Sequence, residues 1–200
     1  MAELPPDSPF GPNAKYDQFD KIPSLTTAHA TLMGLTFVVL LPLGSLLIRL
    51  VKSKYGIWIH VACQLIGWVI MLAGLAMGIQ LADIVDIFGK PHTVIGTVVV
   101  AALILQPVFG YVHHRFFKAK QKRTWWTTLH VWYGRLFIIL GLVNGGAGLA
   151  LVKGTPVYSK AGTITYAVLA AVSGIMMLAL IPLVIKKRRN EAAEKTQSSG

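Results

Sequence analysis

The sequence has little charge and almost no cysteine. Only 14% of its 200 residues are charged, whereas a typical soluble domain has about a quarter, and 54% are hydrophobic. This balance excludes a soluble enzyme domain and a disordered chain. The single cysteine, Cys63, cannot form an intrachain disulfide, so a disulfide-stabilised scaffold is excluded as well. The chain also lacks a glycine-rich dinucleotide fingerprint and any Ser/His/Asp or Cys/His constellation suited to hydrolysis.

Five apolar runs are long enough to cross a bilayer, which takes about 20 residues of helix. They cover residues 27–48, 57–81, 92–112, 129–152 and 163–185. We therefore predict an all-α integral membrane protein with five transmembrane helices, in one domain at 25–185. Residues 1–24 are polar, rich in Pro and Asp, and without the apolar core of a signal peptide, so they are predicted to form an extended tail. Residues 186–200 are predicted to form a basic, mobile tail.

The basic residues predict the orientation, because lysine and arginine favour the cytoplasmic side. They gather in the first and third connections and after the last run, whereas the N-terminal tail is net acidic. We expect the N-terminus outside and the C-terminus in the cytoplasm, in the plasma membrane or an endomembrane. The formal charge of +11 then mostly reflects topology, and no nucleic-acid partner is expected. The clusters are Arg49, Lys52, Lys54; Arg115, Lys118, Lys120, Lys122, Arg123; and Lys186, Lys187, Arg188, Arg189.

Four of the six histidines lie one per run, each near the start of its run: His29, His60, His92 and His130. Ionisable residues at membrane depth are costly, and a functional site is the default hypothesis for them. Successive helices run in opposite directions, so His29 and His92 share the outer leaflet. His60 and His130 share the cytoplasmic leaflet. Two pairs at two depths are the arrangement needed for two bis-histidine haems in the bundle of the first four helices.

Glycines lie in phase with three of these histidines. Eighteen residues make five helical turns, about 27 Å, and return to the same face. In the second, third and fourth runs the residue eighteen positions after the histidine is Gly78, Gly110 or Gly148. A flat macrocycle would need such clearance, although close helix packing explains glycines too. The first run departs from the pattern with Leu47, while Gly96 and Gly134 follow their histidines by four residues.

Haem iron is the metal that fits two histidines per leaflet best. Imidazole binds Zn, Cu, Fe and Ni alike, but a tetrahedral zinc site needs further ligands, and each leaflet offers only two of these histidines. Two axial imidazoles leave four positions for a porphyrin, and the surrounding residues are apolar. No Cys-x-x-Cys-His sequence is present, so both haems are predicted to be b-type and bound noncovalently.

The histidine-containing segments resemble the cytochrome b561 domain. They read HATLMGLTFVVLLPLGSLLIR from His29, HVACQLIGW from His60, HTVIGTVVVAALILQPVFGY from His92 and WWTTLHVWYGRLFIILGLVNGGAGL around His130. The resemblance covers 25–185 and implies two b-type haems that pass electrons across the membrane, with ligands paired first with third and second with fourth. Five spans resemble the membrane half of members that carry an extracellular DOMON domain. No DOMON domain is expected in this chain, which leaves the outer electron partner open.

Other polar residues admit two interpretations each. Arg135 could hold a haem propionate or extend toward the cytoplasmic interface. Gln64, Gln106 and Asn144 could bond a propionate or a ligand imidazole, or make interhelical hydrogen bonds. His113 and His114 are expected at the membrane interface rather than as ligands. Pro42 and Pro107 are expected to kink their helices. Lys118, Lys120 and Lys122 could attract an anionic substrate or serve only topology and contact with anionic lipid.

The leading functional hypothesis is a transmembrane electron conduit with ascorbate- or ferric-reductase-like activity and no catalytic side chains. A cytoplasmic reductant such as ascorbate, as the resemblance implies, would supply electrons to an outer acceptor, which could be a small molecule, ferric iron or a redox protein. One alternative is a membrane haem-anchor subunit of a larger dehydrogenase or respiratory complex. Such anchors often carry two ligands on one helix, at a spacing that no histidines here have. The other alternative is a non-redox transporter or scaffold with structural histidines.

Overall fold

The computed structural model describes residues 10–51, 53 and 55–197, with side chains described up to residue 179. Within these residues the chain is helical, with no strand. Five helical segments are long and apolar enough to cross a membrane, which confirms the predicted number of spans. Of the sequence predictions, residues 1–9, Lys52, Lys54, residues 198–200 and the side chains of Lys186, Lys187, Arg188 and Arg189 lie outside the described residues.

The first span combines three helical pieces. A short 3₁₀ helix, η1 (Tyr16–Lys21), leads into α1 (Ile22–Gly34), the π-helix η2 (Leu35–Leu40) and α2 (Leu41–Leu50). The second span is α3 (Gly56–Val85), and the third is divided into α4 (Pro91–Ile104) and α5 (Gln106–Lys120). The fourth span is α6 (Trp125–Leu151). The last helix, α7 (Lys160–Gln197), continues through most of the segment expected to be a basic tail.

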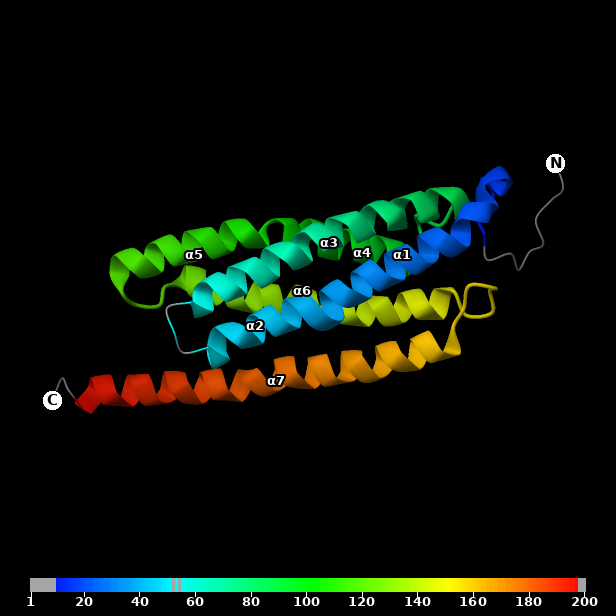
Figure 1. Cartoon of the computed structure of the whole chain (residues 1–200). Coiled ribbons are helices and arrows are strands. Elements are labelled where there is room, and N and C mark those ends of the chain that lie inside the picture. Colours follow the sequence, from blue (N-terminus) through cyan, green and yellow to red (C-terminus); the bar gives the residue numbers. More distant parts are fainter. Residues whose placement is uncertain (1–9, 52, 54, 198–200) are drawn as a thin grey trace.

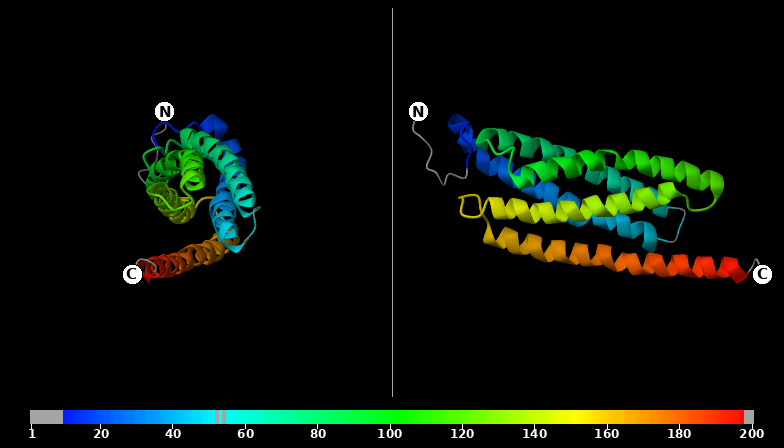
Figure 2. Two further views of the ribbon diagram at one scale, coloured as in Figure 1. Left: turned by 90° about the vertical axis from the view of Figure 1, so that its left-hand side faces the viewer. Right: turned by 180° about the vertical axis from the view of Figure 1, so that it is seen from behind.

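The helices lie roughly parallel and form an elongated bundle (Figure 1). α1 and α2 pack against α3, whereas α4 and α5 pack against α6. α7 contacts α6, η2 and α2, and seen end-on it lies outside the ring formed by the other helices (Figure 2). The first four spans therefore surround the space between them, and the fifth, which carries no histidine, borders them on one side.

The two prolines that were predicted to kink their helices both lie where the regular α-helix is interrupted. Pro42 follows the π-helix η2, and Pro107 follows the turn at Leu105 that separates α4 from α5. Proline has no N–H, so a carbonyl in the turn before it loses its helical donor. In the turn before Pro42, the carbonyl of Val38 accepts a hydrogen bond from the hydroxyl of Ser173 on α7. A neighbouring helix thus supplies a donor beside the proline, where an apolar membrane offers none.

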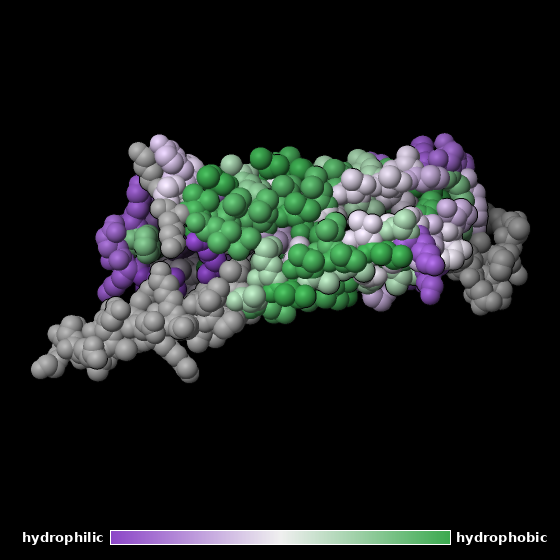
Figure 3. Space-filling view, turned by 60° about the horizontal axis from the view of Figure 1, so that its bottom comes forward, coloured by the Kyte–Doolittle hydropathy of each residue, from purple (hydrophilic) through white to green (hydrophobic). Residues whose placement is uncertain are grey.

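The buried core lies at mid-length in the bundle. It includes Met71 on α3, Val99 and Val100 on α4, and Ile138 on α6, each between the histidine of its span and the glycine eighteen residues later. The outside is apolar as well: Figure 3 shows a hydrophobic band across the middle of the molecule and hydrophilic residues at both ends. An apolar band between polar ends is the surface that a bilayer requires, and this is an integral, multi-pass membrane protein.

Residues 10–21 differ from the extended tail expected from the sequence. The N–H groups of Gly11 and Lys15 donate to the carbonyls of Val85 and Ile84 at 2.9 and 2.8 Å. The ammonium of Lys15 pairs with the carboxylate of Asp83 at 2.6 Å. The last carbonyls of a helix have no partner within it, so the end of α3 offers acceptors that hold this segment in place. Residues 22–24 already belong to α1.

Candidate functional site

The four helix-start histidines form two facing pairs. His29 on α1 faces His92 on α4 with ring centroids 6.0 Å apart and ring planes at 88°. His60 on α3 faces His130 on α6 with centroids 6.4 Å apart and planes at 87°. The structure therefore brings together the two pairs derived from helix direction. We refer to them as the His29–His92 site and the His60–His130 site.

Each of these imidazoles bonds a carbonyl oxygen through Nδ1. The partners are the main-chain carbonyls of Gly74 for His29 at 2.8 Å, Gly44 for His60 at 2.8 Å and Asn144 for His92 at 2.9 Å, and the side-chain Oε1 of Gln106 for His130 at 3.0 Å. A carbonyl only accepts, so each bond requires the proton on Nδ1 and leaves the lone pair of Nε2 for a ligand role. Metal-binding histidines typically have their second nitrogen held in this way.

The separation of the rings fits one metal ion between each pair. Imidazole–metal bonds of about 2 Å on opposite sides of one ion place the ring centroids about 6 Å apart. Among the described residues, no group of three or more His, Cys, Asp or Glu could hold a metal ion. Two imidazoles alone leave most positions of an iron ion for a cofactor to fill, as a porphyrin does.

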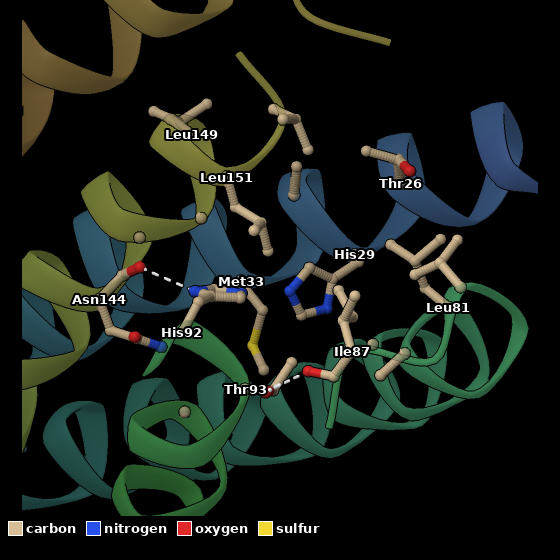
Figure 4. A pocket seen from close by; sticks show the side chains of 18 of the residues that line it. Thr26, His29, Met33, Leu81, Ile87, His92, Thr93, Asn144, Leu149 and Leu151 are labelled. Carbon is tan, nitrogen blue, oxygen red and sulfur yellow. Dashed lines mark hydrogen bonds between the residues drawn. The ribbon is translucent and has the colours of Figure 1, made fainter. Parts of the chain in front are cut away.

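The His29–His92 site opens into a cavity of about 480 Å³, within the usual size range of cofactor pockets, which is about 300–1,000 Å³. Both rings point into it, and Figure 4 shows the bond from His92 to Asn144 beside Met33. Apolar side chains and glycines line much of the cavity; the glycines include Gly34, Gly78, Gly96, Gly141, Gly145 and Gly148. Its walls suit a flat, apolar macrocycle, so the residues present fit a haem.

The glycines in phase with histidine lie against imidazoles of neighbouring helices. A Cβ atom at Gly78 would lie 2.6 Å from Cε1 of His29, and one at Gly148 would lie 2.7 Å from Cε1 of His92. At Gly110 it would lie 3.1 Å from Cε1 of His130. Each glycine thus leaves room for an imidazole ring from the helix that packs against its own. That these three glycines also border a macrocycle stays a prediction.

The remaining polar candidates gather near the His60–His130 site. Arg135 is buried on α6, with its guanidinium carbon 5.3 Å from the centroid of the Trp132 ring. Arg49 interacts electrostatically with Arg135 and with Arg123, which concentrates positive charge at this end. The amide of Gln64 donates to the carbonyl of Leu41 at 3.0 Å, so it makes an interhelical bond rather than one to an imidazole.

His113, expected at the membrane interface rather than as a ligand, stacks on His130. Their centroids are 5.9 Å apart with planes at 18°, and Nδ1 of His113 lies 3.0 Å from the hydroxyl of Thr127. The available signal was its position three residues after Gly110, one helical turn along the same face. Lys118, Lys120 and Lys122 are exposed at the same end of the bundle.

A five-span helical bundle with facing imidazoles at two levels has the architecture of a membrane cytochrome of b type. Residues 28–154 match the family model described as eukaryotic cytochrome b561. The chain belongs to the cytochrome b561 family, and membership implies binding of haem b and transmembrane electron transfer.

The similar curated proteins are larger than this chain. A cytochrome b561 and DOMON domain-containing protein of Arabidopsis thaliana is 32% identical over 185 residues, which cover 86% of this chain and 43% of the relative. A second Arabidopsis thaliana protein of the same description is 28% identical over 127 residues, covering 62% of this chain and 31% of the relative. The chain thus spans less than half the length of these relatives. No solved structure matches it.

Proposed function

We propose that this chain carries electrons across a membrane through two noncovalent b-type haems. His29 and His92 would hold the iron of one haem, and His60 and His130 would hold that of the other. The observation that carries the proposal is the geometry of the pairs: ring centroids 6.0 and 6.4 Å apart, with every Nδ1 held by a carbonyl oxygen. Family membership supports the identity of the cofactor.

The protein's own contribution is to hold, separate and shield the two sites. When bound, the haems supply the one-electron redox chemistry. The carbonyl partners orient the four imidazoles, and the core around Met71 and Ile138 keeps water out of the space between the sites. Gly78, which contacts His29, lies eighteen residues after His60 on the same helix, a rise of about 27 Å, so the sites lie at opposite ends of the bundle. An electron that passes between them crosses much of the membrane potential, worth about 2.3 kcal/mol per 100 mV.

The proposal is tested by the haem content of the purified protein. Two haems per chain are expected, with a reduced-minus-oxidised visible spectrum of b type and complete extraction of the haem into acid acetone, because nothing attaches it covalently. A haem-to-protein ratio near one would exclude the two-site arrangement. A colourless protein would favour the alternative of structural histidines in a transporter or scaffold.

The direction of transfer follows from the predicted topology. With the N-terminus outside, the His60–His130 site lies on the cytoplasmic side, and Arg115, Lys118, Lys120, Lys122 and Arg123 lie beside it. We propose that a small anionic reductant such as ascorbate donates there and that an acceptor outside receives the electron at the His29–His92 site. The alternative of a haem-anchor subunit of a larger complex makes a different prediction. Partner-dependent reduction of the haems would favour it.

Neutralising Lys118, Lys120 and Lys122 together to glutamine is expected to slow reduction by ascorbate about tenfold at low ionic strength, because exposed charges steer an anion to its site. The difference is expected to vanish near 1 M salt, where the Debye length falls to about 3 Å. Stopped-flow absorbance of the haems measures the rate.

The matched control for these lysines is at the opposite end of the bundle, where Lys90, Lys153 and Lys160 are also exposed. Their neutralisation is expected to leave the reduction rate unchanged. If the variant at Lys118, Lys120 and Lys122 inserted normally and kept the wild-type rate at low salt, these lysines would not steer the reductant. Their role would then be to set the membrane topology.

A further inference from the structure

His130 differs from the other three ligand histidines in its hydrogen-bond partner. His29, His60 and His92 bond main-chain carbonyls, whereas Nδ1 of His130 bonds the side-chain oxygen of Gln106 at 3.0 Å. A main-chain carbonyl is present whatever residue occupies its position. The partner of His130 depends on the identity of one side chain, so this site can be altered by substitution without touching a ligand.

Gln106 holds His130 with both ends of its amide. Its Nε2 donates to the main-chain carbonyl of His130 at 3.1 Å, while its Oε1 faces Nδ1 of the same residue. The carbonyl accepts only, so the NH₂ end must face it and the oxygen must face the ring. The proton of the imidazole is therefore fixed on Nδ1, and the lone pair of Nε2 is directed to the space shared with His60.

Two features of the backbone leave room for the side chain of Gln106 beside His130. Gln106 is the first residue of α5, directly after the turn at Leu105 that divides the third span. Gly134 lies one helical turn after His130, and a Cβ atom at this position would overlap Nε2 of Gln106. The absence of a side chain at Gly134 is therefore a requirement for the two bonds. This gives Gly134 a specific role that its spacing from His130 alone did not reveal.

We infer that Gln106 is a positioning residue that fixes the tautomer and orientation of His130 and thereby sets the reduction potential of the haem at the His60–His130 site. The inference rests on the proposed function, because it takes His130 as an axial ligand. A hydrogen bond from Nδ1–H to an acceptor makes the imidazole a more basic ligand. A more basic ligand favours ferric over ferrous iron and lowers the potential, so losing the acceptor raises it.

The test replaces Gln106 by methionine, which is similar in length and accepts no comparable bond. In Gln106→Met we expect the ferric–ferrous equilibrium of the haem at this site to shift about tenfold toward ferrous, equivalent to 59 mV for one electron. Spectroelectrochemical titration measures both haems, and the component that disappears in His60→Ala identifies this one. Gln64→Met is the control, because Gln64 is on the same span as His60 but bonds Leu41 and no histidine.

Two further variants and a matched control keep the inference testable if Gln106→Met loses its haem. Gly134→Ala should reproduce the shift by displacing the amide, whereas Gly146→Ala on the same helix should not, since a Cβ atom there meets no neighbouring atom within 4 Å. Gln106→Glu keeps an acceptor oxygen, so its haem should load normally and its potential should be at or below that of the wild type.

A raised potential, or loss of this haem alone, in both Gln106→Met and Gly134→Ala supports the inference. It is overturned if both variants retain this haem at the wild-type potential. Equal shifts at both haems, or in Gln64→Met, would also overturn it by showing a general effect on packing. Failure of the proposed function gives a different result: the wild type itself would lack two haems, or His60→Ala and His130→Ala would leave both in place.

Discussion

Replacing His29 by alanine is expected to remove the haem of the His29–His92 site and to leave the haem of the His60–His130 site in place. Loss of one axial imidazole leaves the iron with a single protein ligand. The two sites share no histidine, and a buried core separates them. Haem content should fall from two per chain to one, and the visible spectrum should lose one component. His92→Ala should give the same result.

The reciprocal variants His60→Ala and His130→Ala are expected to remove the other spectral component. His114→Ala is the matched control, because His114 belongs to neither facing pair. If His29→Ala and His60→Ala abolished the same component, the assignment of pairs would be wrong.

Replacing Gly148 by alanine is expected to reduce haem occupancy of the His29–His92 site severely without changing any ligand. The new methyl group would lie 2.7 Å from Cε1 and 3.0 Å from Nδ1 of His92, so the ring must move. Movement breaks the bond from Nδ1 to the carbonyl of Asn144 and misdirects Nε2. Loss of an outer-shell partner typically lowers metal affinity about 10–100-fold. Haem titration of the apoprotein, followed by absorbance, measures this loss.

The control for that substitution lies two residues away on the same helix. Gly146 is exposed and has no neighbouring atom within 4 Å of its Cβ position, so Gly146→Ala should bind haem as the wild type does. Gly78→Ala should reproduce the effect of Gly148→Ala from the other side of the site, through His29. Wild-type haem affinity in both Gly148→Ala and Gly78→Ala would show that these glycines serve helix packing alone.

The sequence predicted the features that depend on spacing along one helix. Runs of about 20 apolar residues predict spans, and the alternation of helix direction is enough to pair His29 with His92 and His60 with His130. The contacts between helices could not be predicted in the same way. Nothing in the spacing indicates that the carbonyl of Gly74 on α3 accepts from a histidine of α1. The ordered segment 10–21 was missed because its partners are main-chain carbonyls at the end of α3, which any sequence offers.

The hydrogen bond from Ser173 to Val38 ties the fifth helix to the four histidine-bearing spans. Truncation before α7 would remove this donor from the carbonyl of Val38, a buried core residue, at a cost of about 1 kcal/mol. The same truncation would remove Tyr166, whose hydroxyl donates to the carbonyl of Leu142 at 2.7 Å. We therefore expect a haem-binding unit cut from this chain to be less stable without the fifth helix, although that helix supplies no ligand.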